Sequence, residues 1–191
     1  ETLKKGAACI TDADVNAKAG GDTTPLMSAS FSGRADVIQE LVAAKADVKA
    51  KNLFGATALI FAAQDGNPEA VRLLIAAKAD VNAQSAHPST PQEAGDPTAL
   101  ILASQKGNLD AVRLLLEAKA DVNTKTSDGD TALILASKNG HLDVVRELLA
   151  AKADVDSKSM DGTTVLNAAG ARADIKALLM QAGAKPMISQ H

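Results

Sequence analysis

This chain of 191 residues has few aromatic side chains: three Phe, no Tyr and no Trp. Its core must therefore be built from Ala, Leu, Val and Ile, and small Ala side chains let helices pack closely. Cys9 is the only cysteine, which excludes an internal disulfide framework and a multi-cysteine zinc site. No apolar run approaches the roughly 18 residues of a membrane-spanning helix, so the sequence predicts no insertion into a membrane.

Groups that could carry chemistry are also scarce. The three histidines, His87, His141 and His191, have no companion at metal-ligand spacing, so the sequence predicts no metal site and no cofactor. Cys9 falls at an apolar helix position, which favours a buried structural thiol over a nucleophile. The formal net charge is -3 and there is no long basic run, so nucleic-acid binding is not expected. The sequence therefore predicts a protein that is not an enzyme.

The sequence says little about compartment. A single thiol fits a reducing compartment and slightly favours the cytoplasm. The chain starts at Glu1 without Met, which is also compatible with the periplasm, or with secretion after processing. We expect a monomer.

The tripeptide Ala-Asp-Val recurs at a fixed distance. Val15, Val48 and Val81 are 33 residues apart, as are Val122 and Val155. From Val81 to Val122 the distance is 41 residues, the same period plus 8. A period of this length indicates one supersecondary unit that buries its apolar face by stacking on its neighbours.

Each unit predicts two helices. A Thr-x-Leu tripeptide, such as Thr57-Ala58-Leu59, places an N-cap before a short apolar helix, and Pro25 fits the first helical position. A glycine then ends that helix. The second helix begins with Asn67 or Asn108 as a polar N-cap, and a polar stretch with turn signals follows as a hairpin. The helix pairs are expected near 24–44, 57–77, 98–118, 131–151 and 164–182.

The pattern resembles the ankyrin repeat. The closest matches are Asp-Gly-Asp-Thr-Ala-Leu-Ile-Leu-Ala at 128–136 and Gly-His-Leu-Asp-Val-Val-Arg-Glu-Leu-Leu at 140–149. The resemblance implies an all-α, curved and elongated ankyrin-repeat solenoid of stacked helix pairs with short β-hairpin connections.

We interpret 1–191 as a single domain. Its first segment, 1–23, is expected to be a half-repeat cap and hairpin, or the cut end of a longer array. An inserted hairpin loop is expected at 84–97, and a tail at 184–191. The loop contains His87 and three prolines, and it is either a partner contact or a tolerated surface excursion.

Two departures from the family pattern stand out. The glycine expected before Ala-Asp-Val is kept only at Gly183, so lysines are expected in a left-handed conformation. These lysines form an edge that is either an anion-binding strip or a solvated edge with local charge pairing to nearby Asp residues. The histidine expected after Thr-x-Leu is replaced, mostly by apolar residues, so packing should substitute for polar bracing. The lysines are Lys45, Lys78, Lys119 and Lys152, and the replacements are Met27, Ile60, Ile101, Ile134 and Asn167.

The resemblance implies a non-catalytic module that binds a protein partner through its hairpin tips and concave helix surface. Phe31 and Phe54 fall in this surface, either as a contact or as a local apolar lid, whereas Phe61 is expected in the helix core. The alternatives are a structural spacer or regulatory domain of a larger multidomain protein and, with less support, a small-anion binder along the lysine edge. The expected contact residues are Phe31, Ser32, Leu53, Phe54, Ala56, Gln64, Asp65, His87, Gln105, Lys106, Lys138, Asn139 and Met160.

Overall fold

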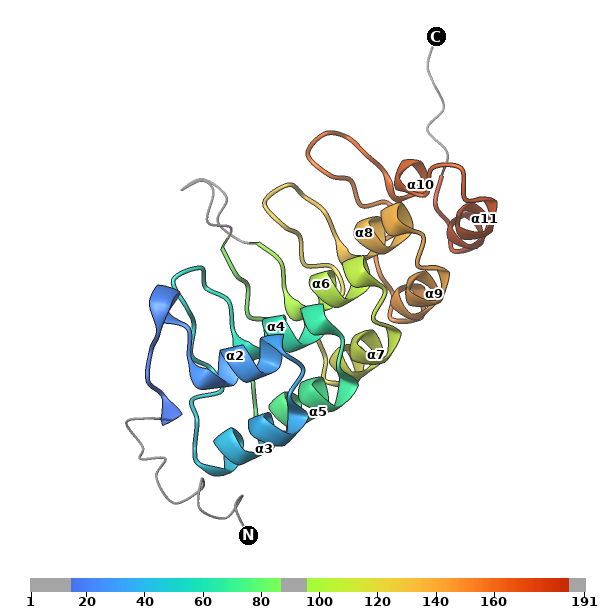
Figure 1. Cartoon of the computed structure of the whole chain (residues 1–191). Helices are drawn as coiled ribbons and strands as arrows, with labels where there is room; N and C mark the ends of the chain where they lie inside the picture. Colours follow the sequence, from blue (N-terminus) through green and yellow to red (C-terminus); the bar gives the residue numbers. More distant parts are fainter. Residues whose placement is uncertain (1–14, 87–95, 186–191) are drawn as a thin grey trace.

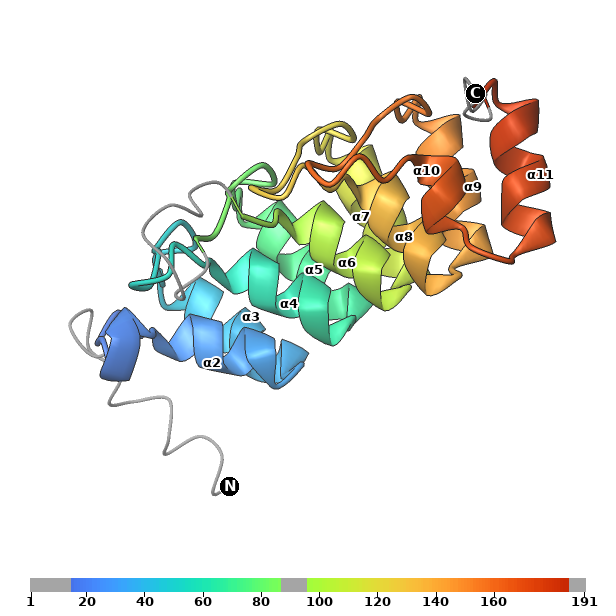
Figure 2. The same ribbon diagram turned by 90° about the horizontal axis from the view of Figure 1, so that it is seen from above.

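The structure is a computed structural model that describes residues 15–86 and 96–185. Within them, five helix pairs stack in chain order into an elongated array (Figure 1). The first helices of the pairs form one row and the second helices a parallel row, while the connecting hairpins project from the first row (Figure 2). The pairs are α2 (Pro25–Phe31) with α3 (Ala35–Ala43), α4 (Ala58–Asp65) with α5 (Pro68–Ala76), α6 (Ala99–Lys106) with α7 (Leu109–Glu117), α8 (Ala132–Asn139) with α9 (Leu142–Ala150), and α10 (Val165–Ala168) with α11 (Ala173–Gln181).

The repeating threonine starts every first helix as predicted. At α4 the Thr57 side chain accepts a hydrogen bond from the Ile60 N–H at 3.4 Å, and each of the other four threonines makes the matching bond. Pro25 occupies the first turn of α2, where its missing N–H costs nothing. The same short motif therefore sets the start of each repeat and the direction in which its first helix leaves the hairpin.

The four lysines adopt the left-handed conformation that the sequence predicts. Their φ angles are +64° to +67°. At the end of α5, the Lys78 N–H bonds to the Ile75 carbonyl and the Ala79 N–H bonds to the Leu74 carbonyl, both at 3.0 Å. This pair of bonds is the Schellman motif, in which the left-handed position is usually glycine. Gly183 makes the corresponding turn in the last repeat with φ +104°.

The core is one continuous apolar stack of Ala, Leu, Val and Ile, together with Met27. Four of the residues that replace the family histidine are buried: Met27, Ile60, Ile101 and Ile134 are each at most 3 % exposed. Apolar side chains therefore pack into the core at these positions, as expected.

The start of the second helix differs from the prediction at one repeat. Asn67 caps α5 by accepting from the Glu69 and Ala70 N–H groups, at 3.0 and 3.3 Å. Asn108 makes no such cap on α7. Its side-chain amide instead donates to the Ala63 carbonyl of the preceding repeat at 2.9 Å. Asn67 also donates to the preceding repeat, to the Gly33 carbonyl at 2.7 Å, so this bond does not by itself prevent capping. The prediction of Asn108 as a local cap is wrong because its backbone has ψ 77°, whereas Asn67, which precedes Pro68, has the extended ψ of 110° that a cap needs.

The hairpins carry less β-structure than expected. The described residues form three isolated bridges, such as Gln84–Thr98, and no strand. Neighbouring hairpins are nevertheless tied together at their tips. The Leu53 N–H donates to the Gly21 carbonyl at 3.0 Å, and the Met160 N–H donates to the Asp128 carbonyl at 2.7 Å. The hairpins therefore form a laterally bonded row beside the first helices.

No helix in the described ranges is both long enough and apolar enough to span a bilayer. Cys9, His87 and His191 fall outside the described residues, as do most of the expected N-terminal cap, the central part of the inserted loop and most of the tail.

Candidate binding surface

A hollow of about 500 Å³ lies between the hairpins and the first helices α4, α6 and α8. Its floor is apolar because Phe61, Leu102 and Leu135 occur at one position of three successive repeats, four residues after the capping threonine. Phe61 and Leu102 are half-buried, and Leu135 is buried. We call this hollow, defined by Phe54, Phe61, Leu102, Leu135, Asp128 and Asp130, the inner groove.

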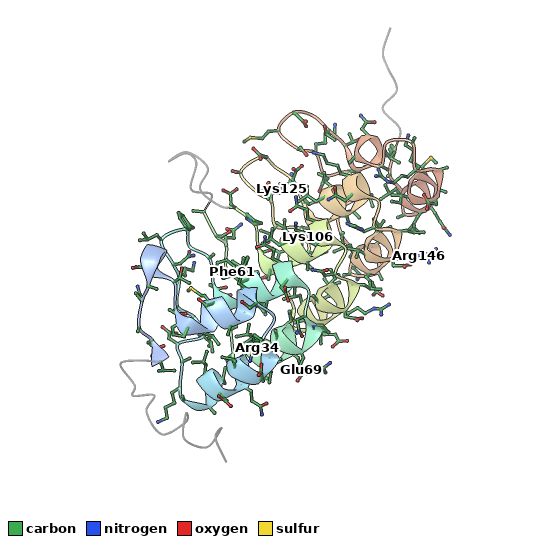
Figure 3. The ribbon with its side chains drawn as sticks, viewed as in Figure 1. Arg34, Phe61, Glu69, Lys106, Lys125 and Arg146 are labelled. Carbon is green, nitrogen blue, oxygen red and sulfur yellow. The ribbon has the colours of Figure 1, made fainter. Side chains whose placement is uncertain are left out.

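Phe61 corrects one expectation from the sequence. It was expected in the helix core, but it lies half-buried on the groove side of the first-helix row (Figure 3). Its ring meets the Phe31 ring edge to face, with centroids 6.0 Å apart and an interplanar angle of 87°. The fourth residue after the threonine packs against the core from the groove side and stays partly exposed, whereas its neighbours Ile60 and Ala62 are buried.

The other two aromatic side chains are exposed. Phe31 is 60 % exposed and Phe54 is 43 % exposed. Phe54 reaches toward Gly21 of the preceding hairpin, and it also lines the inner groove. The ring contact thus joins Phe31 to Phe61, and much of the surface of Phe31 and of Phe54 faces solvent.

A second hollow of about 320 Å³ continues the inner groove toward the C-terminus, because Asp128 and Asp130 line both. Asp161 and Lys138 are added there. The pKa of the Asp161 carboxyl lies below its usual value, chiefly because the Thr163 backbone N–H donates to it at 2.8 Å, and also because of the Thr163 hydroxyl and the charge of Lys138. The acidic side of the surface therefore spans two hairpins.

Hydrogen bonds hold two of these carboxylates in place. Asp130 accepts from the Ser159 hydroxyl of the next hairpin. Asp96, which is 6 % exposed and lines the inner groove, accepts from the Ser127 hydroxyl at 2.7 Å. The positions of Asp96 and Asp130 are thus fixed by neighbouring repeats before any partner binds.

The expected contact residues divide into several groups. Phe54, Ala56, Gln64 and Gln105 line the inner groove, although Ala56 is only 7 % exposed and can offer little surface. Lys138 and Met160 line the second hollow. Leu53 is exposed at a hairpin tip, and the remaining exposed members stand at the ends of first helices: Phe31, Ser32, Asp65, Lys106 and Asn139.

The Asn139 side chain links two repeats at this surface. Its side-chain amide donates to the Gln105 carbonyl at 2.9 Å, and the His141 Nε2 donates to the same oxygen at 3.0 Å. Because a carbonyl oxygen only accepts, the Nε2 of His141 carries the proton. These two bonds connect the third and fourth repeats.

Sequence reasoning missed Phe61, Leu102 and Leu135 as groove residues. A signal was present, because all three are large and apolar at one register of consecutive repeats. For Phe61 the expectation of a core position follows from assigning every apolar residue of the short first helix to its buried face. Asp128 and Asp130 were missed as well, since turn chemistry alone explains acidic residues in a hairpin.

The lysine edge lacks the local charge pairing that was expected of it. The ion pairs within the described residues do not include Lys45, Lys78, Lys119 or Lys152, which are all exposed. The nearby Asp side chains instead accept backbone N–H groups, as Asp80 does from Asn82 at 3.0 Å. The edge is therefore solvated, and its carboxylates stabilise turns.

The part of the chain that the structure describes contains no group of three His, Cys, Asp or Glu side chains that could hold a metal ion. A family model described as ankyrin repeats (3 copies) matches residues 2–85, 26–126, 84–159 and 100–190. No curated protein matches the chain.

Proposed function

Because the chain belongs to the ankyrin repeat family, whose members are generally non-catalytic protein-interaction modules, we propose that it binds a partner protein through the inner groove and the adjoining hairpin tips. The partner contacts would come from the first helices α4, α6 and α8 and from the hairpins that precede and follow them. We further propose that the protein acts as a monomer and without catalysis of its own.

The apolar floor of the inner groove is the observation that carries this proposal. Three repeats supply large apolar side chains at the same register, and exposed Phe31 and Phe54 stand beside them. Apolar surface gathered in a concavity, with a polar rim, is typical of interaction sites rather than of inert surface. Large, partly buried aromatic side chains also contribute disproportionately to binding energy at protein interfaces.

The surrounding structure supports a rigid surface. Hairpin tips are bonded to one another, and the side chains of Asn108 and Asn139 join successive repeats. A surface fixed before binding loses less conformational entropy when a partner docks. The lysine edge has weaker support, because the left-handed turns and hydrogen-bonded Asp residues account for its appearance without a ligand.

Affinity capture from the source cell, read by mass spectrometry, tests the proposal. The bait is wild type, a Phe31→Ala/Phe54→Ala variant, or the control Met180→Ala, which removes a 50 % exposed side chain from α11. We expect one or more proteins to be captured by wild type and by the control but lost with the double variant. Equal capture by all three baits would contradict the proposal and move the partner site elsewhere on the protein, whereas capture of no protein by wild type would favour the structural-spacer alternative.

A further inference from the structure

We propose that the inner groove selects an extended segment of a partner protein in which a bulky apolar side chain lies close to a lysine or arginine. This inference rests on the proposed function and names the chemistry of the segment that the groove fits. The apolar side chain would contact Phe61, Leu102 and Leu135, and the cation would lie at Asp128 and Asp130.

The charge of the lining is one-sided. The residues that line the 500 Å³ hollow include Asp96, Asp128 and Asp130, and among its described lining residues there is no Lys, Arg or His. In the adjoining hollow a single cation, Lys138, accompanies the three carboxylates of Asp128, Asp130 and Asp161. A partner that places a carboxylate here would face repulsion, whereas a cation would be attracted.

Apolar and acidic features meet in one hollow. The floor residues come from helices and the carboxylates from the hairpins that precede α6 and α8, so a segment lying across the floor also passes the carboxylates. The Asp130 carboxylate accepts a hydrogen bond from the Ser159 hydroxyl. Asp128 is exposed at the hairpin tip, and its backbone carbonyl accepts from the Met160 N–H. A basic residue near an apolar one therefore satisfies both features with a short stretch of chain.

The shape favours an extended segment. The two hollows share Asp128 and Asp130, and together they run from the hairpin that precedes α4 to the hairpin that precedes α10. Such a path across successive repeats suits a chain that lies along the array. A partner that presents a folded, convex surface is the alternative that the experiment below separates.

Selection of random linear peptides displayed on phage, with the whole chain as the target, tests this inference. Enriched peptides are synthesised with a fluorescein label, and their affinities are measured by anisotropy. We expect peptides with Lys or Arg within a few residues of Phe, Leu, Ile or Met. We also expect Asp128→Asn/Asp130→Asn to weaken their binding by about threefold to fivefold at low salt, and to reduce its salt dependence.

Asp110→Asn/Asp143→Asn is the matched control. It removes the same charge from the second-helix row, where each Asp pairs with an Arg three residues later. Binding by this control should equal that of wild type. Asn at position 130 can still accept from Ser159, so the groove variant keeps its hairpin bond.

The outcomes separate the two proposals. Peptides that bind wild type and lose affinity for Phe31→Ala/Phe54→Ala, but show no basic enrichment or no effect of Asp128→Asn/Asp130→Asn, overturn this inference and leave the proposed function standing. Enrichment of no linear peptide also overturns it and favours a folded partner. Peptides that bind the double Phe variant as well as wild type contradict the proposed function itself.

Discussion

Four lysines hold a left-handed conformation that glycine adopts more easily, and replacing one of them should stabilise the protein. We choose Lys78 because it ends α5 in the interior of the array with φ +67°. The left-handed region costs a residue with a Cβ about 1–2 kcal/mol. Glycine avoids that cost, but it loses about 0.4–1 kcal/mol through the greater freedom of the unfolded chain.

The lost charge of Lys78 subtracts a further small amount. A cation at a helix C-terminus contributes about 0.3 kcal/mol at the lower end of its range, which applies here because Lys78 is exposed and makes no ion pair within the described residues. Taken at the middle of their ranges, these contributions predict that Lys78→Gly raises the free energy of unfolding by about 0.5 kcal/mol.

Urea denaturation followed by circular dichroism measures this change as a shift in midpoint at constant slope. Lys78→Ala is the control, because it removes the charge and keeps the Cβ, and it should not stabilise the protein. Gly183→Lys, the reverse change at the corresponding turn, should be destabilising. Destabilisation by Lys78→Gly would refute the reasoning and show that packing or charge of the lysine outweighs the backbone cost.

Three further predictions concern stability. Ser104→Ala should be neutral or should stabilise the protein by up to about 1 kcal/mol in thermal unfolding, because the buried Ser104 hydroxyl has no partner in the described ranges. Alanine also fits this position, since Ala63 occupies the equivalent place in α4. Ser30→Ala, which removes the hydrogen bond from the Ser30 hydroxyl to the Leu26 carbonyl at 2.7 Å, should cost about 1 kcal/mol. Asn108→Ala should destabilise by about 1–2 kcal/mol in urea, since it leaves the Ala63 carbonyl without its partner from the next repeat, and an unchanged midpoint would contradict this role. The pKa of Asp161 is lower in the folded protein than its value of about 4 in the unfolded chain, so the ionised carboxylate stabilises the fold above pH 4, and this stability is lost as the pH falls through the folded pKa. Asp161→Asn should therefore lose less stability than wild type when the pH is lowered from about 4 through the folded pKa. Identical pH profiles of unfolding for the two proteins would count against the shift.

The repeat architecture could be predicted from sequence because its determinants are local. Thr57 caps the next turn, and Lys78 or Gly183 closes a helix within five residues. A fixed period then places each such motif in every repeat, so the helix pairs follow from the spacing alone.

The details that sequence could not supply depend on contacts across repeats. Asn67 and Asn108 both donate to a carbonyl of the preceding repeat, which no local pattern predicts, and only Asn67, which is followed by Pro68, also caps its own helix. The side of α4 that Phe61 occupies depends on the hairpins packed beside it, which a single-helix pattern does not contain. The expected contact residues show the same limit: Ala56 is buried, and Asn139 bonds to the preceding repeat.

The most direct test of the central claim is the affinity of a captured partner or selected peptide for the Phe31→Ala/Phe54→Ala variant, measured by isothermal titration calorimetry. Both side chains are exposed, so the variant should lose less stability than Phe61→Ala and remain folded. Binding through the inner groove and hairpin tips predicts a loss of more than about 1 kcal/mol, or roughly fivefold in Kd. An unchanged Kd for the folded variant would contradict the claim and move the site elsewhere on the protein.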